Sequence, residues 1–193
     1  MQTLLINPPY QTITSNRGVG HQVPLGLLMV GGAVRDAGFD VSLLDAEALR
    51  LDVEQIADHV RRTAPTVVMT GHAGSTPAHP VCMAMLEAVK KARPETVGVY
   101  GGVFPTYHDE IVLRDHPYVD IIVRGEGEAT ATAVVHALRA SYSVKSLDFC
   151  EEWCEPAIFV ADPGSYGEVR VGADLMWREA GFEAWLLDWL PDD

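Results

Sequence analysis

Residues able to contact a ligand lie in four short segments of this chain, each directly after a run of apolar residues. The first segment is Asn7-Pro8-Pro9-Tyr10. Its two prolines fix the backbone and remove two N–H donors, so the segment cannot continue a strand. Such a stiff segment could form a wall for a ligand, or it could simply end a strand. The residues leave both interpretations open.

The second segment begins with Thr70-Gly71-His72, continues through Ser75-Thr76 and leads into a helix near Pro80. Its side chains are small, so a bulky ligand could approach the backbone. Hydroxyl groups can bond an amide or a phosphate, and the N–H groups at a helix start favour anions. Ser75 or Thr76 could equally cap the helix. The sequence has no Gly-Lys-Ser/Thr of a P-loop, so nucleotide hydrolysis has no support.

The last two segments bring pairs of glycines to strand ends. The third is Gly101-Gly102-Val103-Phe104-Pro105-Thr106, and the fourth is Gly125-Glu126-Gly127-Glu128. Paired glycines at a strand end indicate either close contact between backbone and ligand or a tight reversal of the chain. Glutamates at a helix start are stabilised by the helix dipole, and the fourth segment could be only a charged turn.

Short apolar runs alternate with helical patterns over the first 140 residues. Strands are predicted over 3–6, 40–44, 66–69, 97–100 and 120–123, and helices over 26–37, 53–63, 80–93, 109–114 and 129–140. This alternation predicts a doubly wound α/β fold with a mainly parallel five-stranded sheet, Rossmann-like or flavodoxin-like. In such sheets ligands bind beyond the carboxyl ends of the strands, which is where the four segments would gather.

The pattern changes after residue 140, which divides the chain into a Rossmann-like domain (1–140) and a C-terminal part (141–193). Residues 141–156 are acidic and irregular, which predicts a linker. A strand over 157–160, a helix over 165–180 and a strand over 184–187 predict a βαβ-like extension. Its four tryptophans, together with the acidic residues, could bind a partner or form the core of the extension: Trp153, Trp177, Trp185 and Trp189.

The amino-acid composition argues against two classes of binding partner, nucleic acids and membranes. Lys and Arg total 14 against 27 Asp and Glu, a formal net charge of -13. Such a chain repels nucleic-acid phosphates and suits anionic membrane surfaces poorly, so neither partner is expected. The sequence has no apolar run of about 20 residues and no basic, apolar signal at its start. Three cysteines are too few for a disulfide framework, so a reducing cytoplasm is expected.

Taken in order, several motifs resemble those of the N-terminal cobalamin-binding domain of class B radical SAM enzymes, which include the anaerobic magnesium-protoporphyrin monomethyl ester cyclases and many methyltransferases. The motifs are Asn7-Pro8-Pro9, Pro24-Leu25-Gly26-Leu27, Ala37-Gly38-Phe39, Gly101-Gly102 with Pro105-Thr106, and Gly125-Glu126-Gly127-Glu128. The resemblance covers about residues 1–139. It implies a corrinoid lying across the carboxyl ends of the strands, with its nucleotide tail in a crevice beside the sheet.

The resemblance also implies which segments would contact which part of the cofactor. Residues 70–76 and Gly101-Gly102 would line the tail. Residues 7–10, 104–106 and 125–128 would lie nearer the ring. Val103, between Gly102 and Phe104, is also predicted to bind the cofactor.

Histidine ligation of cobalt cannot be assigned from the sequence. The Asp-x-His-x-x-Gly motif, through which another cobalamin family supplies a histidine, is missing after the first strand. His72, His79 and His108 occur in suitable loops, yet loop histidines also serve as polar surface or packing residues. Base-off cobalamin with no assignable histidine ligand is therefore expected, and the metal ligands stay unknown.

The cysteine motif that binds the iron–sulfur cluster in the catalytic half of radical SAM enzymes is incomplete in this sequence. Cys150 and Cys154 have the spacing of the first two thiolates of Cys-x-x-x-Cys-x-x-Cys, but Ala157 stands in the third place. Nearby carboxylates also disfavour an anionic cluster, so we expect no 4Fe–4S cluster. Zinc would need a second ligand pair, and none is evident.

The resemblance therefore implies a cobalamin-binding module with no catalysis of its own, alone or beside a radical SAM chain or domain. A small α/β ligand-binding or regulatory domain that has lost corrinoid binding is the alternative. No Gly-x-Ser-x-Gly elbow supports a hydrolase.

Overall fold

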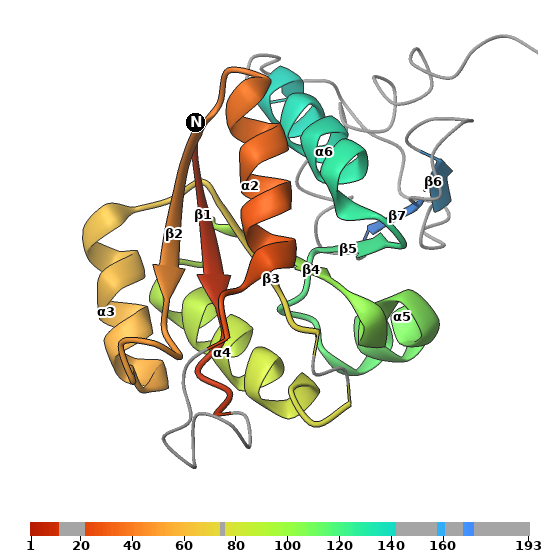
Figure 1. Cartoon of the computed structure of the whole chain (residues 1–193). Coiled ribbons are helices and arrows are strands. Elements are labelled where there is room, and N and C mark those ends of the chain that lie inside the picture. Colours follow the sequence, from red (N-terminus) through yellow and green to blue (C-terminus); the bar gives the residue numbers. More distant parts are fainter. Residues whose placement is uncertain (12–21, 74–75, 142–157, 161–167, 172–193) are drawn as a thin grey trace, which may run out of the picture.

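The computed structural model describes residues 1–11, 22–73, 76–141, 158–160 and 168–171, and these form a seven-stranded sheet flanked by helices (Figure 1). The strands are β1 (Gln2–Asn7), β2 (Asp40–Asp45), β3 (Val67–Gly71), β4 (Val97–Gly101), β5 (Ile121–Arg124), β6 (Ile158–Val160) and β7 (Glu168–Val171). The helices are α2 (Leu25–Asp36), α3 (Val53–Thr63), α4 (His79–Ala92), α5 (Val103–Asp115) and α6 (Gly127–Ser141).

Strand order explains where a ligand site can form. The order is β2-β1-β3-β4-β5-β7-β6, and the first five strands are parallel. The chain moves from β1 to β2 in one direction and from β3 to β5 in the other, so the winding reverses between β1 and β3. That reversal is the topological switch point at which open α/β sheets bind ligands. The predicted doubly wound, five-stranded parallel fold is confirmed.

Alternate residues of the central strands belong to two separate cores. Leu5, Met69 and Val99 pack on the face covered by α2 and α6. Their neighbours Leu4 and Tyr100 pack on the opposite face, against α3, α4 and α5. Figure 1 shows α2 beside α6, and α3 beside α4. Burial on both faces explains why these strands are nearly continuous apolar runs.

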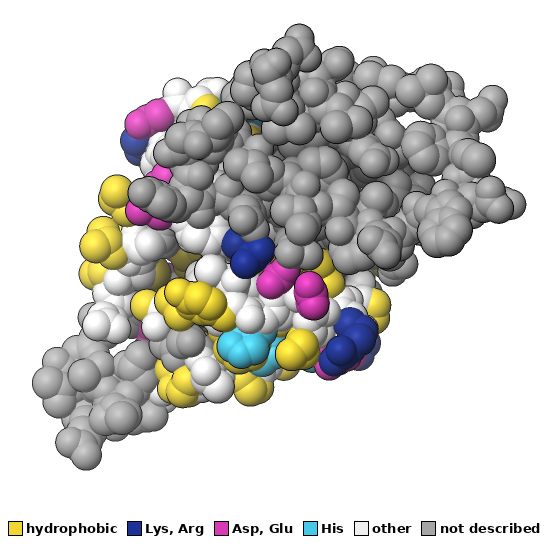
Figure 2. Space-filling view, turned by 90° about the vertical axis from the view of Figure 1, so that its right-hand side faces the viewer, with side chains coloured by type: hydrophobic (Ala, Val, Ile, Leu, Met, Phe, Trp, Pro, Cys, Tyr) yellow, Lys and Arg dark blue, Asp and Glu magenta, His cyan; other side chains and the backbone are white. Residues whose placement is uncertain are grey.

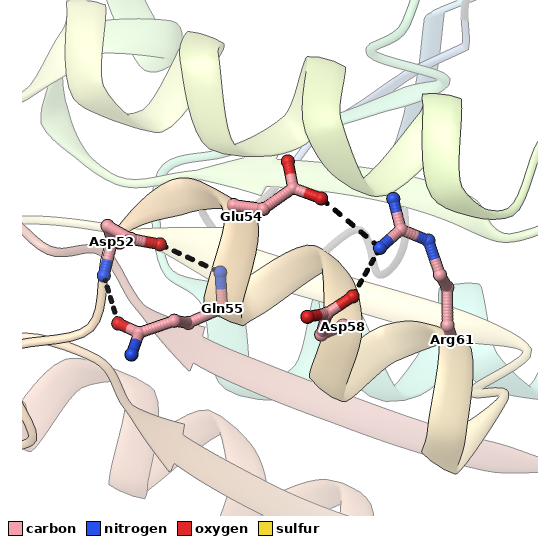
Figure 3. A network of polar contacts seen from close by, with 5 residues as sticks. All are labelled: Asp52, Glu54, Gln55, Asp58 and Arg61. Carbon is pink, nitrogen blue, oxygen red and sulfur yellow. Dashed lines mark hydrogen bonds and ion pairs between the residues drawn. The ribbon is translucent and has the colours of Figure 1, made fainter.

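Helix α3 shows how clearly a local signal can fix an element. The Asp52 carboxylate accepts a hydrogen bond from the Gln55 N–H (2.8 Å), and the Gln55 side-chain oxygen accepts one from the Asp52 N–H (2.9 Å). This capping box satisfies two N–H groups at the helix start. Arg61 then contacts Asp58 and Glu54 along the exposed side of the helix (Figure 3). The helix begins and ends at the predicted residues, 53 and 63.

Two elements differ from the sequence-based prediction. The helix predicted over 165–180 is wrong at residues 168–171, which form β7 and pair with β5 antiparallel. Val169 and Val171 alternate with charged residues, the two-residue period of a strand. Helix α5 begins at Val103 rather than at Asp109, so the third predicted loop segment is mostly helical, with a kink at His108.

The C-terminal part is only partly described. The strand predicted over 157–160 is present as β6, and β6 pairs with β7 in the same sheet. Residue 141, predicted as the start of the linker, is instead the last residue of α6. The rest of the predicted linker, with Cys150 and Cys154, the four tryptophans and the strand predicted over 184–187 all lie outside the described residues. The division at residue 140 stays a prediction. In the described part of the chain, no helix combines the length and apolar character needed to cross a membrane.

A buried ion pair joins α4 to the amino ends of β4 and β5. Asp120 is fully buried and accepts hydrogen bonds from the Lys90 ammonium (2.5 Å) and from the Gly98 N–H (2.7 Å). Lys90 also donates to the carbonyl oxygen of Thr96 at 2.8 Å. Removing one partner of such a pair leaves the other charge buried, which is costly.

We therefore expect Lys90→Met to lower the free energy of unfolding by about 3 kcal/mol, the scale of a broken buried pair. The adjacent Lys91 is the matched control because its pair with Glu87 is exposed, and Lys91→Met should change stability by less than about 1 kcal/mol. Urea unfolding followed by circular dichroism measures both. Equal losses in the two variants would contradict this role for the buried pair.

Candidate functional site

A layer that is poor in side chains lies at the carboxyl ends of the central strands. Gly71 of β3 pairs in register with Gly101 of β4, and Gly101 pairs with Val123 of β5. Alternation along the strands places these residues on the same face as Met69 and Val99, toward α2 and α6. Two of the three positions in this layer therefore carry no side chain, and we call it the glycine layer.

A cavity of about 690 Å³ lies above the glycine layer, between the first turns of α2 and α6. The carboxyl ends of β1, β3, β4 and β5 contribute its inner side, including Met69, Val99 and Val123. The lining is mainly apolar, and its volume lies in the range of small-molecule and cofactor sites.

Glycine is required at two positions beside the cavity. A Cβ atom on Gly71 would lie 2.6 Å from the carbonyl oxygen of Gly101, closer than atoms can pack. Gly102 has φ of +101°, a conformation that side chains with a Cβ rarely adopt. A Cβ on Gly101 would instead make ordinary contacts with Val123, at 3.6 and 3.7 Å, so a side chain there has room to enter the cavity.

The predicted site residues divide into two groups. Ten line the cavity: Asn7, Thr70, Gly71, His72, Gly101, Gly102, Val103, Gly125, Gly127 and Glu128. Eight do not: Pro8, Pro9, Tyr10, Thr76, Phe104, Pro105, Thr106 and Glu126. Ser75 lies outside the described residues. The first group brings the ends of four strands to one place, as the parallel sheet predicts.

Sequence reasoning missed the wall formed by the start of α2. Residues 22–27 and Val30 line the cavity, as does Ala131 of α6. The motif Pro24-Leu25-Gly26-Leu27 was a usable signal, because it is one of those that carry the family resemblance. In the structure Val23 and Leu25 are apolar yet 63% and 67% exposed. A Cβ on Gly127 would lie 3.0 Å from Val30, so glycine lets the starts of α2 and α6 approach closely.

Polar side chains fix the strand ends at the switch point. Asn7 is buried and donates through Nδ2 to the Asp45 carboxylate (2.8 Å), which joins the ends of β1 and β2. The Thr70 hydroxyl donates to the carbonyl oxygen of Ile6 (2.9 Å), which joins β3 to β1. These contacts hold the carboxyl ends of β1, β2 and β3 together.

His72 is the histidine that lines the cavity among the described residues. Its ring contacts the edge of Tyr10, with centroids 5.1 Å apart. Burial lowers the pKa of His72 from the ordinary value of 6.5, and the negative charge of Glu47 opposes that shift. The balance favours a neutral imidazole beside the cavity.

His79 and His108 serve a different purpose on the opposite face of the sheet. The Phe104 ring stacks between them, with centroids 3.9 Å from His79 and 4.4 Å from His108. His79 also lies 3.3 Å from the Tyr100 hydroxyl, and burial lowers its pKa. Figure 2 shows histidine among hydrophobic side chains on the α5 side of the molecule. This stack packs α5 against α4.

Metal-binding side chains do not cluster in the described residues, where no group of three His, Cys, Asp or Glu could hold an ion. Cys82 is a free, buried thiol whose pKa is raised by burial to about 12, so it stays protonated. The site therefore fits a bulky organic group better than a bare metal ion: it offers an apolar cavity, glycine backbone at its edge and two helix starts.

The sequence profile described as "B12 binding domain" matches residues 14–135, more than half of the 193 residues. The chain belongs to the B12-binding domain family. This match confirms the resemblance to cobalamin-binding domains that the strand-end motifs predicted, and with it the general function of a cobalamin-binding module.

Curated relatives of this B12-binding domain are much longer proteins. It is 42% identical over 148 residues to the anaerobic magnesium-protoporphyrin IX monomethyl ester cyclase of Synechocystis sp., which covers 77% of this chain and 30% of the cyclase. It is 31% identical to an uncharacterized methyltransferase of Pyrococcus horikoshii, over 76% of this chain and 31% of that protein. The chain thus spans less than a third of the length of these relatives.

Solved structures share the fold of the B12-binding domain. TsrM, a radical S-adenosylmethionine methyltransferase from Kitasatospora setae solved with cobalamin and a 4Fe–4S cluster, aligns with a TM-score of 0.61 at 18% identity. That alignment covers 72% of this chain and 26% of TsrM. OxsB, a cobalamin-dependent radical enzyme, aligns with a TM-score of 0.56 at 15% identity, over 72% of this chain and 19% of OxsB.

The electrostatics of His72 give a direct test of its surroundings. Glu47→Gln removes the charge that opposes the effect of burial, so the pKa of His72 should fall further. The NMR signals of the His72 ring, followed from pH 8 to pH 4, measure this pKa. Glu54→Gln, on the exposed side of α3, is the control and should leave the titration unchanged.

The sign of the pH effect on stability follows from the same shift. A histidine whose pKa is lower in the folded state binds protons more readily when unfolded. The stability contributed by the neutral His72 ring is therefore fully present above pH 6.5, the ordinary pKa of histidine. It is lost as the pH falls from there through the lower pKa of the folded state. An unchanged or raised pKa in Glu47→Gln would contradict the assigned contact.

Proposed function

We propose that this B12-binding domain holds cobalamin across the carboxyl ends of β1, β3, β4 and β5, with part of the cofactor in the cavity between α2 and α6. The observation that carries the proposal is the cavity of about 690 Å³ above Gly71 and Gly101. The cavity is partly open and its lining is mainly apolar, so the lining atoms lack contacts that packed neighbours would make. An apolar cofactor surface restores those contacts.

Backbone groups would hold the polar parts of the cofactor. Lys and Arg are not among the described side chains that line the cavity, and Glu128 is acidic. An anionic group such as the phosphate of the nucleotide tail would therefore bind N–H groups at the starts of α2 and α6 or in the loops at Gly102 and Gly125. Small residues at these positions permit the close approach that such bonds need.

The proposed form of the cofactor is base-off, with no protein histidine on cobalt. His79 and His108 stack on Phe104 at the opposite face of the sheet, and the His72 ring rests against Tyr10. When bound, cobalamin supplies a cobalt centre able to exchange electrons or a methyl group. This chain's own part is to bind the corrinoid, orient it and cover one side of it.

Catalysis is proposed to need a partner. The relatives are about three times as long as the matched region, and TsrM carries a 4Fe–4S cluster. We infer that a radical SAM chain or domain supplies the reaction, of the cyclase or methyltransferase type, and that this chain alone is not catalytic and holds no cluster. A reducing cytoplasm is the proposed setting, since Cys82 is a free thiol.

The central experiment measures corrinoid retention. The protein is incubated with excess hydroxocobalamin, desalted and examined by visible spectroscopy and metal analysis. We expect bound corrinoid with the base-off spectrum, cobalt and no iron. A colourless protein at saturating cofactor would falsify the proposed function.

A cavity-filling variant tests the location. Gly101→Leu is expected to fold, because its Cβ has room, and to lower corrinoid affinity at least about tenfold, because the rest of the side chain enters the cavity. Gly32→Leu is the matched control, since an added Cβ there meets no atom within 4 Å and Gly32 does not line the cavity. Full affinity in Gly101→Leu would place the corrinoid elsewhere.

A further inference from the structure

Thr106 does not line the cavity, yet its side chain joins two loops that do. Its hydroxyl donates to the carbonyl oxygen of Gly102 (2.7 Å) and accepts a hydrogen bond from the Gly125 N–H (3.1 Å). Gly102 follows β4 and Gly125 follows β5, and both line the cavity. One hydroxyl therefore fixes the spacing between the third and fourth segments that the sequence singled out.

The glycines in the two loops explain why a hydrogen bond that fixes their conformation matters. Gly102 has φ of +101° and Gly125 has φ of +69°, both in the left-handed region. Glycine gains access to this region at the cost of many competing conformations in the free chain. A hydrogen bond to each loop selects one conformation before a ligand binds, and this lowers the ordering cost of binding.

Arg124, the last residue of β5, makes a second set of contacts to the same region. Its Nε donates to the carbonyl oxygen of Thr106 (3.0 Å) and lies 3.8 Å from a carboxylate oxygen of Asp109 in α5. The stacked ring of Phe104, two residues earlier, packs this helical turn against α4. Both the hydroxyl and the carbonyl of Thr106 thus connect α5 to the end of β5.

We propose that Thr106 is a positioning residue for corrinoid binding: it holds the Gly102 and Gly125 loops at the separation that the cofactor requires. This inference rests on the proposed function and adds a residue to it that does not contact the cavity. The hydroxyl is the essential group, because it supplies one donor and one acceptor to different loops. Serine can replace it, whereas valine, of nearly the same shape, cannot.

The test compares Thr106→Val with Thr106→Ser in the full chain, with hydroxocobalamin as the probe. Thr106→Val should bind hydroxocobalamin about 3- to 10-fold more weakly, the factor that corresponds to one hydrogen bond. Thr106→Ser should bind within about twofold of the unmodified protein, since it keeps the hydroxyl. Thr63→Val is the matched control, because the Thr63 hydroxyl donates to the His59 carbonyl (2.9 Å) within α3 and joins no cavity loop.

A second measurement needs no cofactor. Amide hydrogen exchange followed by NMR should show faster exchange at Gly125 in Thr106→Val than in the unmodified protein, and unchanged exchange in Thr106→Ser. This measurement detects the loss of the loop contact directly, whereas a general loss of stability would accelerate exchange throughout the protein.

The outcomes separate the two proposals. If the unmodified protein retains no corrinoid, the proposed function is wrong and this inference is wrong with it. If the unmodified protein binds and Thr106→Val binds equally well, with Gly125 exchange unchanged, only the role of Thr106 is overturned. An equal loss of affinity in Thr106→Ser and Thr106→Val would also overturn it, since the hydroxyl would then not be the essential group.

Discussion

The backbones of β3 and β4 approach each other at Gly71 and Gly101 so closely that a Cβ on Gly71 would lie 2.6 Å from the Gly101 carbonyl oxygen. Their register therefore depends on a glycine at the end of β3. The same pair leaves the layer above Met69 and Val99 without side chains, and the cavity between α2 and α6 is the result. Substitution of either glycine would change the binding surface, the strand pairing or both.

The two faces of the sheet have different roles: one is filled by packed side chains, and the other contains the cavity. On the α3–α5 face, apolar residues and the stacked rings of His79, Phe104 and His108 fill the space. On the α2 and α6 face, packing is complete near the amino ends of the strands and hollow near the carboxyl ends. A ligand that fills the cavity should stabilise the folded protein by an amount that rises with the logarithm of its affinity.

Much of the fold was predictable because its signals are local. The capping box at Asp52 and Gln55 marks the start of α3, and apolar runs mark the five parallel strands. The helical start of α5 was harder to predict, because Pro105 and paired glycines are typical of both loops and first helical turns. Strand β7 was missed because its four residues lie within a longer segment with helical features.

The candidate site was predictable in outline but not in detail. Parallel strands bring Asn7, Gly101 and Gly125 to one edge, and this follows from topology alone. The contribution of α2 depends on how closely two helices pack. The role of Thr106 depends on its hydrogen bond to Gly125, which lies 19 residues away in the sequence. Such contacts arise from tertiary packing, which a single sequence does not display.

Hydrogen–deuterium exchange of the full chain, with and without hydroxocobalamin, tests the central claim most directly. If the corrinoid occupies the cavity above the glycine layer, protection should appear at the carboxyl ends of β1, β3, β4 and β5 and at the starts of α2 and α6. Helices α3 and α4 should gain less protection, since only the global stabilisation by the ligand reaches them. Protection concentrated on α3 and α4, or spread evenly over the protein, would contradict the assignment of this cavity as the cofactor site.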